Sequence, residues 1–315
     1  MRNTRRFALG AAALALGLLL GACGSGGSGS SSSGAPIAAK LTLGAPPECP
    51  KAPYCLPALK KVYGIKFAKF VPLQAGATTV AAIRTGKVDV GELFSTDPSI
   101  TQFHFVLLKD DKNSQAAGNI VPVIRKDVDN AEIDKLLNAL STKVTTSKIT
   151  QLVEKVAIQK QDPAAVAKSF LTTEGLLGGS SGSGKGSLTV GVSGAFPESQ
   201  IMAEMYAQVL QNAGYTVNTQ LNLASRQVSD AALLHGDIDL KPEYVAYELA
   251  LVDPKANASG PASQVLPRLK AALAKKGVDV LNFTPANDTN AFVVTQQTAS
   301  KYHLSTISDL AKSAS

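Results

Sequence analysis

The sequence has few of the residues that build metal centres and nucleophilic active sites. It contains only three histidines, His104, His235 and His303, and their spacing fits no zinc-ligand motif. No histidine stands in a motif with a serine or cysteine partner, and Ser193-Gly-Ala-Phe-Pro is not the Gly-x-Ser-x-Gly elbow of hydrolases. The sequence therefore argues against an enzyme and predicts neither a metal site nor a cofactor.

Dense clusters of positive charge are also missing. The formal net charge is +7, and it falls to +4 once the three arginines in the first six residues are removed. The remaining lysines and arginines are spread thinly along the chain. Because a protein that reads a phosphate backbone concentrates such residues on one surface, this composition excludes a nucleic-acid partner.

No apolar run is long enough for an ordinary membrane span. The run Phe7–Ala22 holds 16 residues, whereas a helix needs about 20 to cross the bilayer. Arginines before it and small residues at its end are typical of a secretory signal, with an uncleaved anchor helix as the alternative. Leu-Gly-Ala before Cys23 resembles a bacterial lipobox, which implies a diacylated cysteine. We expect a signal peptide at 1–22 and export, with lipidated Cys23 anchoring the chain to the outer face of the cytoplasmic membrane.

Two segments of low complexity divide the rest of the chain. Residues 23–39 are mostly Gly and Ser and are expected to form a flexible tether. A second Gly/Ser-rich segment, residues 178–187, splits the mature chain into two nearly equal parts. The mature length is sufficient for two modest domains or one large one.

The remaining two cysteines, Cys49 and Cys55, lie six positions apart in Glu-Cys-Pro-Lys-Ala-Pro-Tyr-Cys. In an oxidising compartment this spacing predicts a disulfide that closes a small loop. A zinc site is the alternative, but no further cysteine or histidine ligands stand nearby.

The two parts of the mature chain resemble each other. The matching segments are Leu41–Ala45 with Leu188–Val192, and Ala81–Val90 with Ala231–Leu240. The longer pair shares the pattern Ala-Ala-apolar-x-x-Gly-x-apolar-Asp-apolar, with Gly86 and Gly236 150 positions apart. This pattern indicates a helix ended by a left-handed glycine that leads into a buried strand. We predict an internal duplication, chance similarity of two ordinary helix–strand corners being the alternative.

Alternating strand and helix patterns predict an α/β fold with largely parallel sheets. Helices are expected at about Leu56–Val62 and Glu198–Asn212. Ligands in such folds bind beyond the carboxyl ends of the strands. Five loops are thereby placed at a cleft: Ala45–Tyr54, Gly91–Asp97, Ser193–Ser199, Lys241–Tyr247 and Pro285–Asn290.

These loops carry aromatic and neutral polar side chains. Aromatic faces attract a quaternary ammonium by about 0.5–2 kcal/mol each, and amides or hydroxyls can orient the other end of a small ligand. The alternative for any single aromatic residue is core packing, which we predict for Phe67, Phe70, Phe105 and Tyr206. Tyr244 directly follows a buried strand and is predicted to face the cleft.

Several segments resemble the glycine betaine/choline (osmoprotectant) substrate-binding proteins of ABC importers. The N-terminal half of that family is similar to Leu188–Ser193, Phe196–Tyr206, Gly236–Tyr244 and Ala286–Ala291. Its C-terminal half is similar to Val62–Phe67, Gly86–Val90, Phe94–Asp97, Val106–Lys112 and Pro122–Arg125. The family's halves stand in reversed order here, so the resemblance implies a circularly permuted chain whose usual termini are joined by residues 178–187.

The resemblance implies a two-lobed periplasmic-binding-protein fold of type II, the Venus-flytrap fold. Lobe A would comprise residues 40–96 plus 291–315, and lobe B residues 97–177 plus 188–290. The chain would cross between the lobes near Asp97 and near Asn290–Phe292. The lobes would close on a ligand by a hinge motion.

The resemblance also implies a set of ligand-binding residues. Tyr244 and Phe94 stand at positions of tyrosines that form the family's aromatic cage, Asn290 replaces another, and Lys241 stands where aromatics are common. The full expected set is Phe94, Thr96, Asp97, Phe196, Gln200, Lys241, Tyr244, Asn287 and Asn290. The implied function is that of a solute-binding lipoprotein, which delivers a small quaternary-ammonium or other polar osmoprotectant-like solute to the permease of an ABC importer. An extracytoplasmic ligand-sensing module that signals to another membrane protein is the alternative.

Overall fold

The computed structural model describes residues 34–314, apart from residues 75, 179–183 and 195. The expected signal peptide, Cys23 and most of the predicted tether therefore lie outside the described residues. Within the described ranges, no helix has the length and apolar character needed to cross a membrane.

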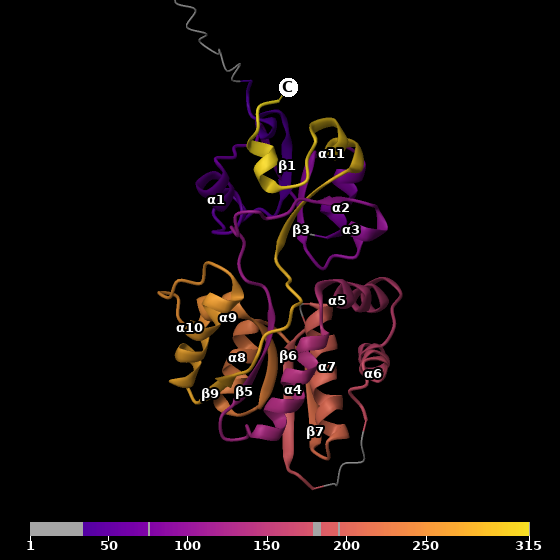
Figure 1. Ribbon diagram of the computed structural model, residues 1–315, viewed down its shortest axis with the longest axis vertical. Helices are drawn as coiled ribbons and strands as arrows, with labels where there is room; N and C mark the ends of the chain where they lie inside the picture. The colour runs from indigo at the N-terminus through magenta and orange to yellow at the C-terminus, as the bar shows by residue number, and fades with distance from the viewer. Residues whose placement is uncertain (1–33, 75, 179–183, 195, 315) are drawn as a thin grey trace, which may run out of the picture. The chain divides into compact units, whose positions relative to one another are not determined.

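Two five-stranded sheets form the framework of the fold (Figure 1). The first has the order β2-β1-β3-β10-β4, with strands β1 Thr42–Ala45, β2 Lys69–Pro72, β3 Val90–Phe94, β4 Val106–Leu107 and β10 Asn290–Val294. The second has the order β7-β6-β8-β5-β9, with strands β5 Ile120–Arg125, β6 Ser187–Ser193, β7 Thr216–Leu223, β8 Leu240–Tyr244 and β9 Val278–Val280.

The two sheets share one topology, as an internal duplication predicts. In each, the first strand of its half pairs in parallel with the next two, while the fourth and fifth strands pair antiparallel. The sheets are therefore mixed, and the expectation of largely parallel sheets was wrong. The reason is that β10 and β5 each enter from the other half of the chain and run against the strand beside them.

Helices surround both sheets. Those of the first half are α1 Leu56–Ala58, α2 Ala77–Arg84, α3 Ser99–Gln102 and, from the chain end, α11 Gln296–Tyr302. Those associated with the second sheet are α4 Ala131–Lys143, α5 Thr146–Val153, α6 Pro163–Thr173, α7 Pro197–Asn212, α8 Arg226–His235, α9 Val245–Val252 and α10 Ala262–Ala274. The sequence located α7 to within one residue, because its apolar stripe of Ile201, Met205 and Val209 is fully buried. The predicted helix at Leu56–Val62 is α1 followed by a wider turn, Leu59–Tyr63.

The repeated helix–strand corners have the predicted geometry. Gly86 (φ 69°) and Gly236 (φ 86°) both lie in the left-handed region that favours glycine. Three residues later, an aspartate carboxylate accepts a hydrogen bond from the backbone of the half's first strand. The two bonds are Thr42 N–H to Asp89 and Thr189 N–H to Asp239, each 2.8 Å.

Two crossing segments, residues 109–119 and 281–289, connect the sheets. The sequence placed the first crossing near Asp97, which is too early: α3 and β4 follow Asp97 and remain with the first sheet, where Val106 pairs with Val294. Burial of Phe105 and Leu108 in the cores beside that sheet explains why. The first segment of lobe A therefore ends at about Leu108 and not at residue 96. The second crossing meets β10 at Asn290, where it was expected.

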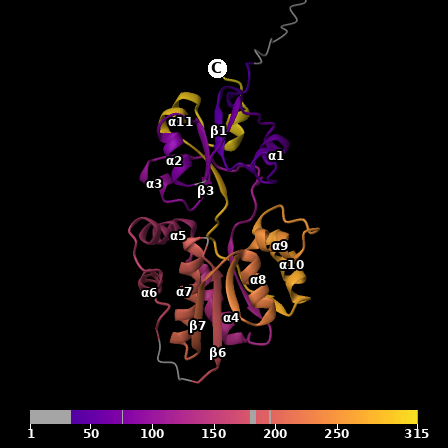
Figure 2. The same ribbon diagram turned by 180° about the vertical axis from the view of Figure 1, so that it is seen from behind.

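The two ends of the described chain lie side by side (Figures 1 and 2). Pro36 bridges to Ser313, and the Ile37 N–H donates to the Lys312 carbonyl at 2.9 Å. Ile37 and Ala38 are buried in the core beside the first sheet. The predicted tether, 23–39, therefore ends earlier than expected, because its last apolar residues belong to the folded unit.

Candidate functional site

Five aromatic rings form a continuous array at the ends of the strands. Each ring meets the next edge to face, and the centroid separations are Tyr54–Tyr247 6.2 Å, Tyr247–Tyr244 6.2 Å, Tyr244–Phe196 6.4 Å and Phe196–Phe94 5.7 Å. Tyr54 and Phe94 come from the first lobe, and the other three from the second. The array therefore joins residues that are far apart in sequence.

A pocket of about 240 Å³ opens on this array. It is lined by Phe94, Phe196, Arg226, Tyr244, Tyr247, Asp288 and Asn290. The ends of secondary-structure elements position these side chains: β3 ends at Phe94, β8 ends at Tyr244, and Phe196 caps the start of α7. An adjoining pocket of about 220 Å³ adds Thr96, Asp97 and Glu198. Six of the nine residues expected from the sequence are brought together here: Phe94, Thr96, Asp97, Phe196, Tyr244 and Asn290.

Two buried carboxyl groups, those of Glu198 and Asp288, lie beside the aromatic rings. The Tyr244 hydroxyl donates to Glu198 at 2.6 Å, and the Thr96 hydroxyl donates to Asp288 at 2.7 Å. Burial raises the pKa of Glu198 to about 8, and the nearby charge of Asp288 adds to this effect. Burial also raises the pKa of Asp288. At neutral pH the two groups can therefore share one proton, which leaves negative charge beside the aromatic faces.

Arg226, the first residue of α8, supplies a cation to the same pocket. Its guanidinium carbon lies 5.4 Å from the centroid of Tyr244 and 5.6 Å from that of Tyr247. Its Nε donates to Glu243 at 2.9 Å, while its two terminal amino groups have no hydrogen-bond partner among the described residues. These free donors can hold a ligand carboxylate in two-point fashion.

Sequence reasoning did not single out Arg226, Glu198 or Asp288 as site residues, although Glu198 and Asp288 lay within the predicted cleft loops. Tyr247 was expected among the aromatic side chains of the cleft loop Lys241–Tyr247, but it was not in the expected ligand-binding set. The only feature of the sequence that pointed to Arg226 was its place at the start of the helix that ends at the repeated Gly236.

Lys241, an expected ligand-binding residue, does not line the pocket. Its side chain is 0% exposed and lies among three carboxylates, bonded to Asp230 and within 3.4 Å of Glu243 and 3.5 Å of Glu248. The physical reason is that a lysine ammonium without water needs such partners. The structure therefore gives Lys241 a place in a buried ion cluster instead of at the ligand.

Gln200 lies apart from the pocket as well. Its amide nitrogen donates to the Leu221 carbonyl and to the Asn222 side chain, both at 3.0 Å. It therefore ties α7 to β7.

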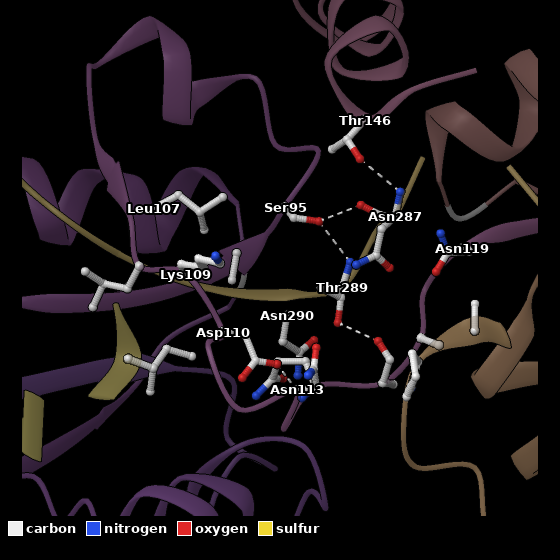
Figure 3. Close-up of a pocket in the computed structure, with 18 of the residues that line it drawn as sticks. Ser95, Leu107, Lys109, Asp110, Asn113, Asn119, Thr146, Asn287, Thr289 and Asn290 are labelled. Atoms are coloured by element: carbon white, nitrogen blue, oxygen red, sulfur yellow. Dashed lines mark hydrogen bonds between the residues drawn. The ribbon is translucent and has the colours of Figure 1, made fainter. Parts of the chain in front are cut away.

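Asn287 lines a larger pocket, of about 480 Å³, together with Ser95 and Thr289 (Figure 3). Ser95 donates to the Asn287 carbonyl at 2.9 Å and accepts from the Thr289 N–H at 3.0 Å. Neighbours of these residues in the chain, Phe94 and Asp288, line the aromatic pocket instead. The larger pocket is lined in part by both crossing segments and shares Asn290 with the aromatic pocket. Its lining contains no aromatic ring, so the smaller pocket is the better candidate site.

Among the residues that the structure describes, two groups of side chains have the spacing of metal ligands. Cys49, Cys55 and Glu92 form one, but the cysteines are joined in the predicted disulfide, so their sulfurs are not free to bind a metal. Asp230, Glu243 and Glu248 form the other, and the Lys241 ammonium occupies its centre. Neither group suits a resident metal ion.

Comparisons with known proteins agree on one family. A model of the substrate binding domain of ABC-type glycine betaine transport systems matches residues 32–173 and 186–315. A carnitine transport binding protein of Listeria monocytogenes, OpuCC, is 29% identical over 119 residues, or 36% of this chain and 37% of that protein. A glycine-betaine-binding protein of Pseudomonas aeruginosa is 30% identical over 134 residues, or 42% of this chain and 43% of that protein. The chain thus matches about two-fifths of the length of these relatives.

Solved structures overlap more weakly. The periplasmic VFT2 domain of Bordetella pertussis BvgS gives a TM-score of 0.40 at 12% identity, covering 88% of this chain and 87% of that one. A substrate-binding domain of a putative amino acid ABC transporter from Streptococcus pneumoniae gives 0.41 at 13% identity, covering 81% and 84%. The two-lobed α/β Venus-flytrap assignment follows from the family model and the two-sheet topology.

Proposed function

The chain belongs to the family of substrate-binding domains of ABC-type glycine betaine transport systems, and from this premise we propose that it binds a small quaternary-ammonium solute in the aromatic pocket. The family consists of binding proteins and not of enzymes. In this proposal the protein works outside the cytoplasmic membrane and delivers the solute to the permease of an ABC importer.

The observation that carries the proposal is the set of aromatic rings that line one small pocket. Phe94, Phe196, Tyr244 and Tyr247 all line it, and each face attracts a quaternary ammonium by about 0.5–2 kcal/mol. A quaternary ammonium has no N–H to donate, so aromatic faces suit it better than hydrogen-bond acceptors do. The buried Glu198 and Asp288 add the negative charge that favours a cation.

Arg226 narrows the proposed ligand to a zwitterion. Arg226 lines the pocket together with Asp288, and Glu198 lines the adjoining pocket. A solute with a quaternary ammonium at one end and a carboxylate at the other matches both charges. Glycine betaine and carnitine have this structure.

The chain order and the anchor are part of the same proposal. We propose that Cys23 carries the lipid and that residues 178–187 join the family's usual termini in a permuted chain. Support for the permutation comes from the paired ends at Pro36 and Ser313 and from the sequence position of residues 178–187, which follow α6 and lead into the first residue of β6. Mass spectrometry of the membrane-bound protein tests the anchor: the Cys23→Ala variant should lose both the lipid mass and the membrane association.

Isothermal titration against glycine betaine, carnitine, choline and ectoine tests the ligand. We expect saturable one-to-one binding of at least one zwitterion, with Tyr244→Ala weakening it. Tyr302→Ala is the matched control, because Tyr302 is a half-buried tyrosine at the end of α11, outside the aromatic array. The absence of binding to all four solutes would remove the osmoprotectant assignment.

A further inference from the structure

The loop closed by the Cys49–Cys55 disulfide contacts the aromatic pocket indirectly, because its residue Tyr54 packs on Tyr247, which lines the pocket. We propose that this loop presents Tyr54 as the outer support of Tyr247, so that the disulfide sets the affinity of the pocket. Tyr54 is then a positioning residue, since it acts through Tyr247 and does not line the pocket itself. The inference rests on the proposed function only for its affinity readout.

The contact between the two tyrosines links the lobes. Tyr54 follows β1 in the first lobe, and Tyr247 lies in α9 of the second. Their ring centroids are 6.2 Å apart and their planes meet at 70°, the edge-to-face geometry that aromatic pairs prefer. The ring of Tyr54 thus contacts the second lobe.

Tyr247 connects the Tyr54 contact to the pocket, because its ring lies between Tyr54 and Tyr244 in the aromatic array. One side of its ring meets Tyr54, and the next ring in the array is Tyr244, 6.2 Å away. Tyr247 lines the pocket, and the Arg226 guanidinium stands over both Tyr244 and Tyr247. A shift of Tyr247 therefore moves a side chain that lines the pocket and also the ring over which the Arg226 guanidinium lies.

The disulfide determines where Tyr54 can be. Both sulfurs belong to residues that are at most 1% exposed, and Tyr54 is the residue directly before Cys55. Turn hydrogen bonds hold both cysteines: Cys49 N–H donates to Pro46 O, just before the loop, at 2.9 Å, and Cys55 N–H donates to Ala52 O, within it, at 3.1 Å. With only five residues between the cysteines, two of them prolines, the closed loop leaves Tyr54 little freedom.

The disulfide also rests on the strand that carries Phe94. The Sγ of Cys55 lies 2.8 Å from a carboxyl oxygen of Glu92 in β3, two residues before Phe94. The Cys55 end of the loop thus contacts β3 through its sulfur and α9 through the neighbouring Tyr54 ring. Breaking the disulfide separates Cys55 from Cys49, and Tyr54 then has to be ordered each time its contact with Tyr247 forms.

Reduction provides the test. Two electrons and two protons pass from the thiols of dithiothreitol to the Cys49–Cys55 bond, which breaks into two protein thiols while the reagent closes to its own cyclic disulfide. Glycine betaine and carnitine affinities are measured by titration calorimetry for the oxidised protein, the reduced protein, Tyr54→Ala, Tyr54→Phe and the control Tyr302→Ala. Melting temperatures are recorded beside them, so that affinities are compared only where each form is folded.

A second readout needs no ligand. A fluorotyrosine at position 247 reports the environment of that ring by ¹⁹F NMR. We expect Tyr54→Ala and reduction each to change this signal and to weaken binding about two- to tenfold, the size of an aromatic pair contact. Reduction should add little once Tyr54 is alanine, and Tyr54→Phe should retain most of the affinity.

The outcomes separate the two proposals. If the oxidised protein binds a zwitterion and neither Tyr54→Ala nor reduction changes its affinity, the positioning role is overturned and the proposed function stands. If no solute binds, the proposed function fails, and the ¹⁹F signal alone decides: a change upon reduction that is lost in Tyr54→Ala supports the coupling, and an unchanged signal overturns it.

Discussion

Phe94 and Tyr244 occupy the same position in the two halves of the fold. They stand 150 residues apart, the spacing of the repeated glycines. Each is the last residue of its half's third strand, and each pairs with the first residue of the strand that enters from the other half, Asn290 for Phe94 and Ile120 for Tyr244. Both rings pack on Phe196. The duplicated topology therefore delivers two equivalent side chains to one pocket.

This equivalence predicts that the two rings contribute similarly to binding. Phe94→Ala and Tyr244→Ala should each weaken glycine betaine binding by about 1 kcal/mol, or roughly fivefold, because each removes one face from the ammonium. Tyr244→Phe keeps the face and should cost less. Titration calorimetry measures all three variants. A large loss for one ring and none for the other would contradict a shared cage.

The zwitterion assignment predicts a selective effect of Arg226→Met. Glycine betaine and carnitine should lose at least tenfold in affinity, because a charge-assisted hydrogen bond contributes about 1.5–3 kcal/mol. Choline carries no carboxylate and should lose little. Parallel titrations with carnitine and choline give the comparison, and Arg226→Lys shows whether charge without the planar fork is enough. Equal losses for both ligands would remove the carboxylate from the argument.

The buried ion cluster predicts that Lys241→Met acts on stability. The substitution leaves the carboxylates of Glu243 and Glu248 without the ammonium that neutralises them, which should cost about 3–5 kcal/mol of unfolding free energy. Urea denaturation measures the loss. Lys275→Met, at an exposed position, should stay within about 0.5 kcal/mol of the unmodified protein. Normal stability with weakened ligand binding would instead return Lys241 to the site.

Glu92 predicts a pH dependence of stability. Burial raises its pKa from 4.5 to about 7, with a smaller contribution from the charge of Glu48. Because the folded state holds the proton more tightly than the unfolded state, stability should decrease as pH rises from about 4.5 to about 7. Glu92→Gln removes this slope and should be more stable than the unmodified protein at pH 8, by on the order of 3 kcal/mol, with little difference at pH 4.

Urea unfolding of both proteins across that pH range measures the effect. Other buried acids remain in the variant, so the difference between the two curves, and not the slope of either, reports Glu92. A difference that is the same at every pH would show that Glu92 does not titrate in this range.

Local physical chemistry made much of the architecture predictable. The buried stripe of α7 repeats within a few residues, and the glycines at 86 and 236 end their helices through their own backbone freedom. The short Cys49–Cys55 spacing favours a local disulfide. The rule that ligands bind at strand ends led from these elements to Phe94, Phe196 and Tyr244 without any coordinates.

Only the tertiary structure decided which charges meet. Lys241 and Tyr244 lie three residues apart in the same strand, yet one is held among carboxylates and the other faces the pocket. Arg226, Glu198 and Asp288 reach the rings from separate elements, and Tyr54 arrives from the opposite lobe. A sequence records neighbours along the chain, whereas burial and pairing depend on contacts between distant segments. The amino-acid order alone therefore determined the elements and the family, and long-range packing determined the chemistry of the site.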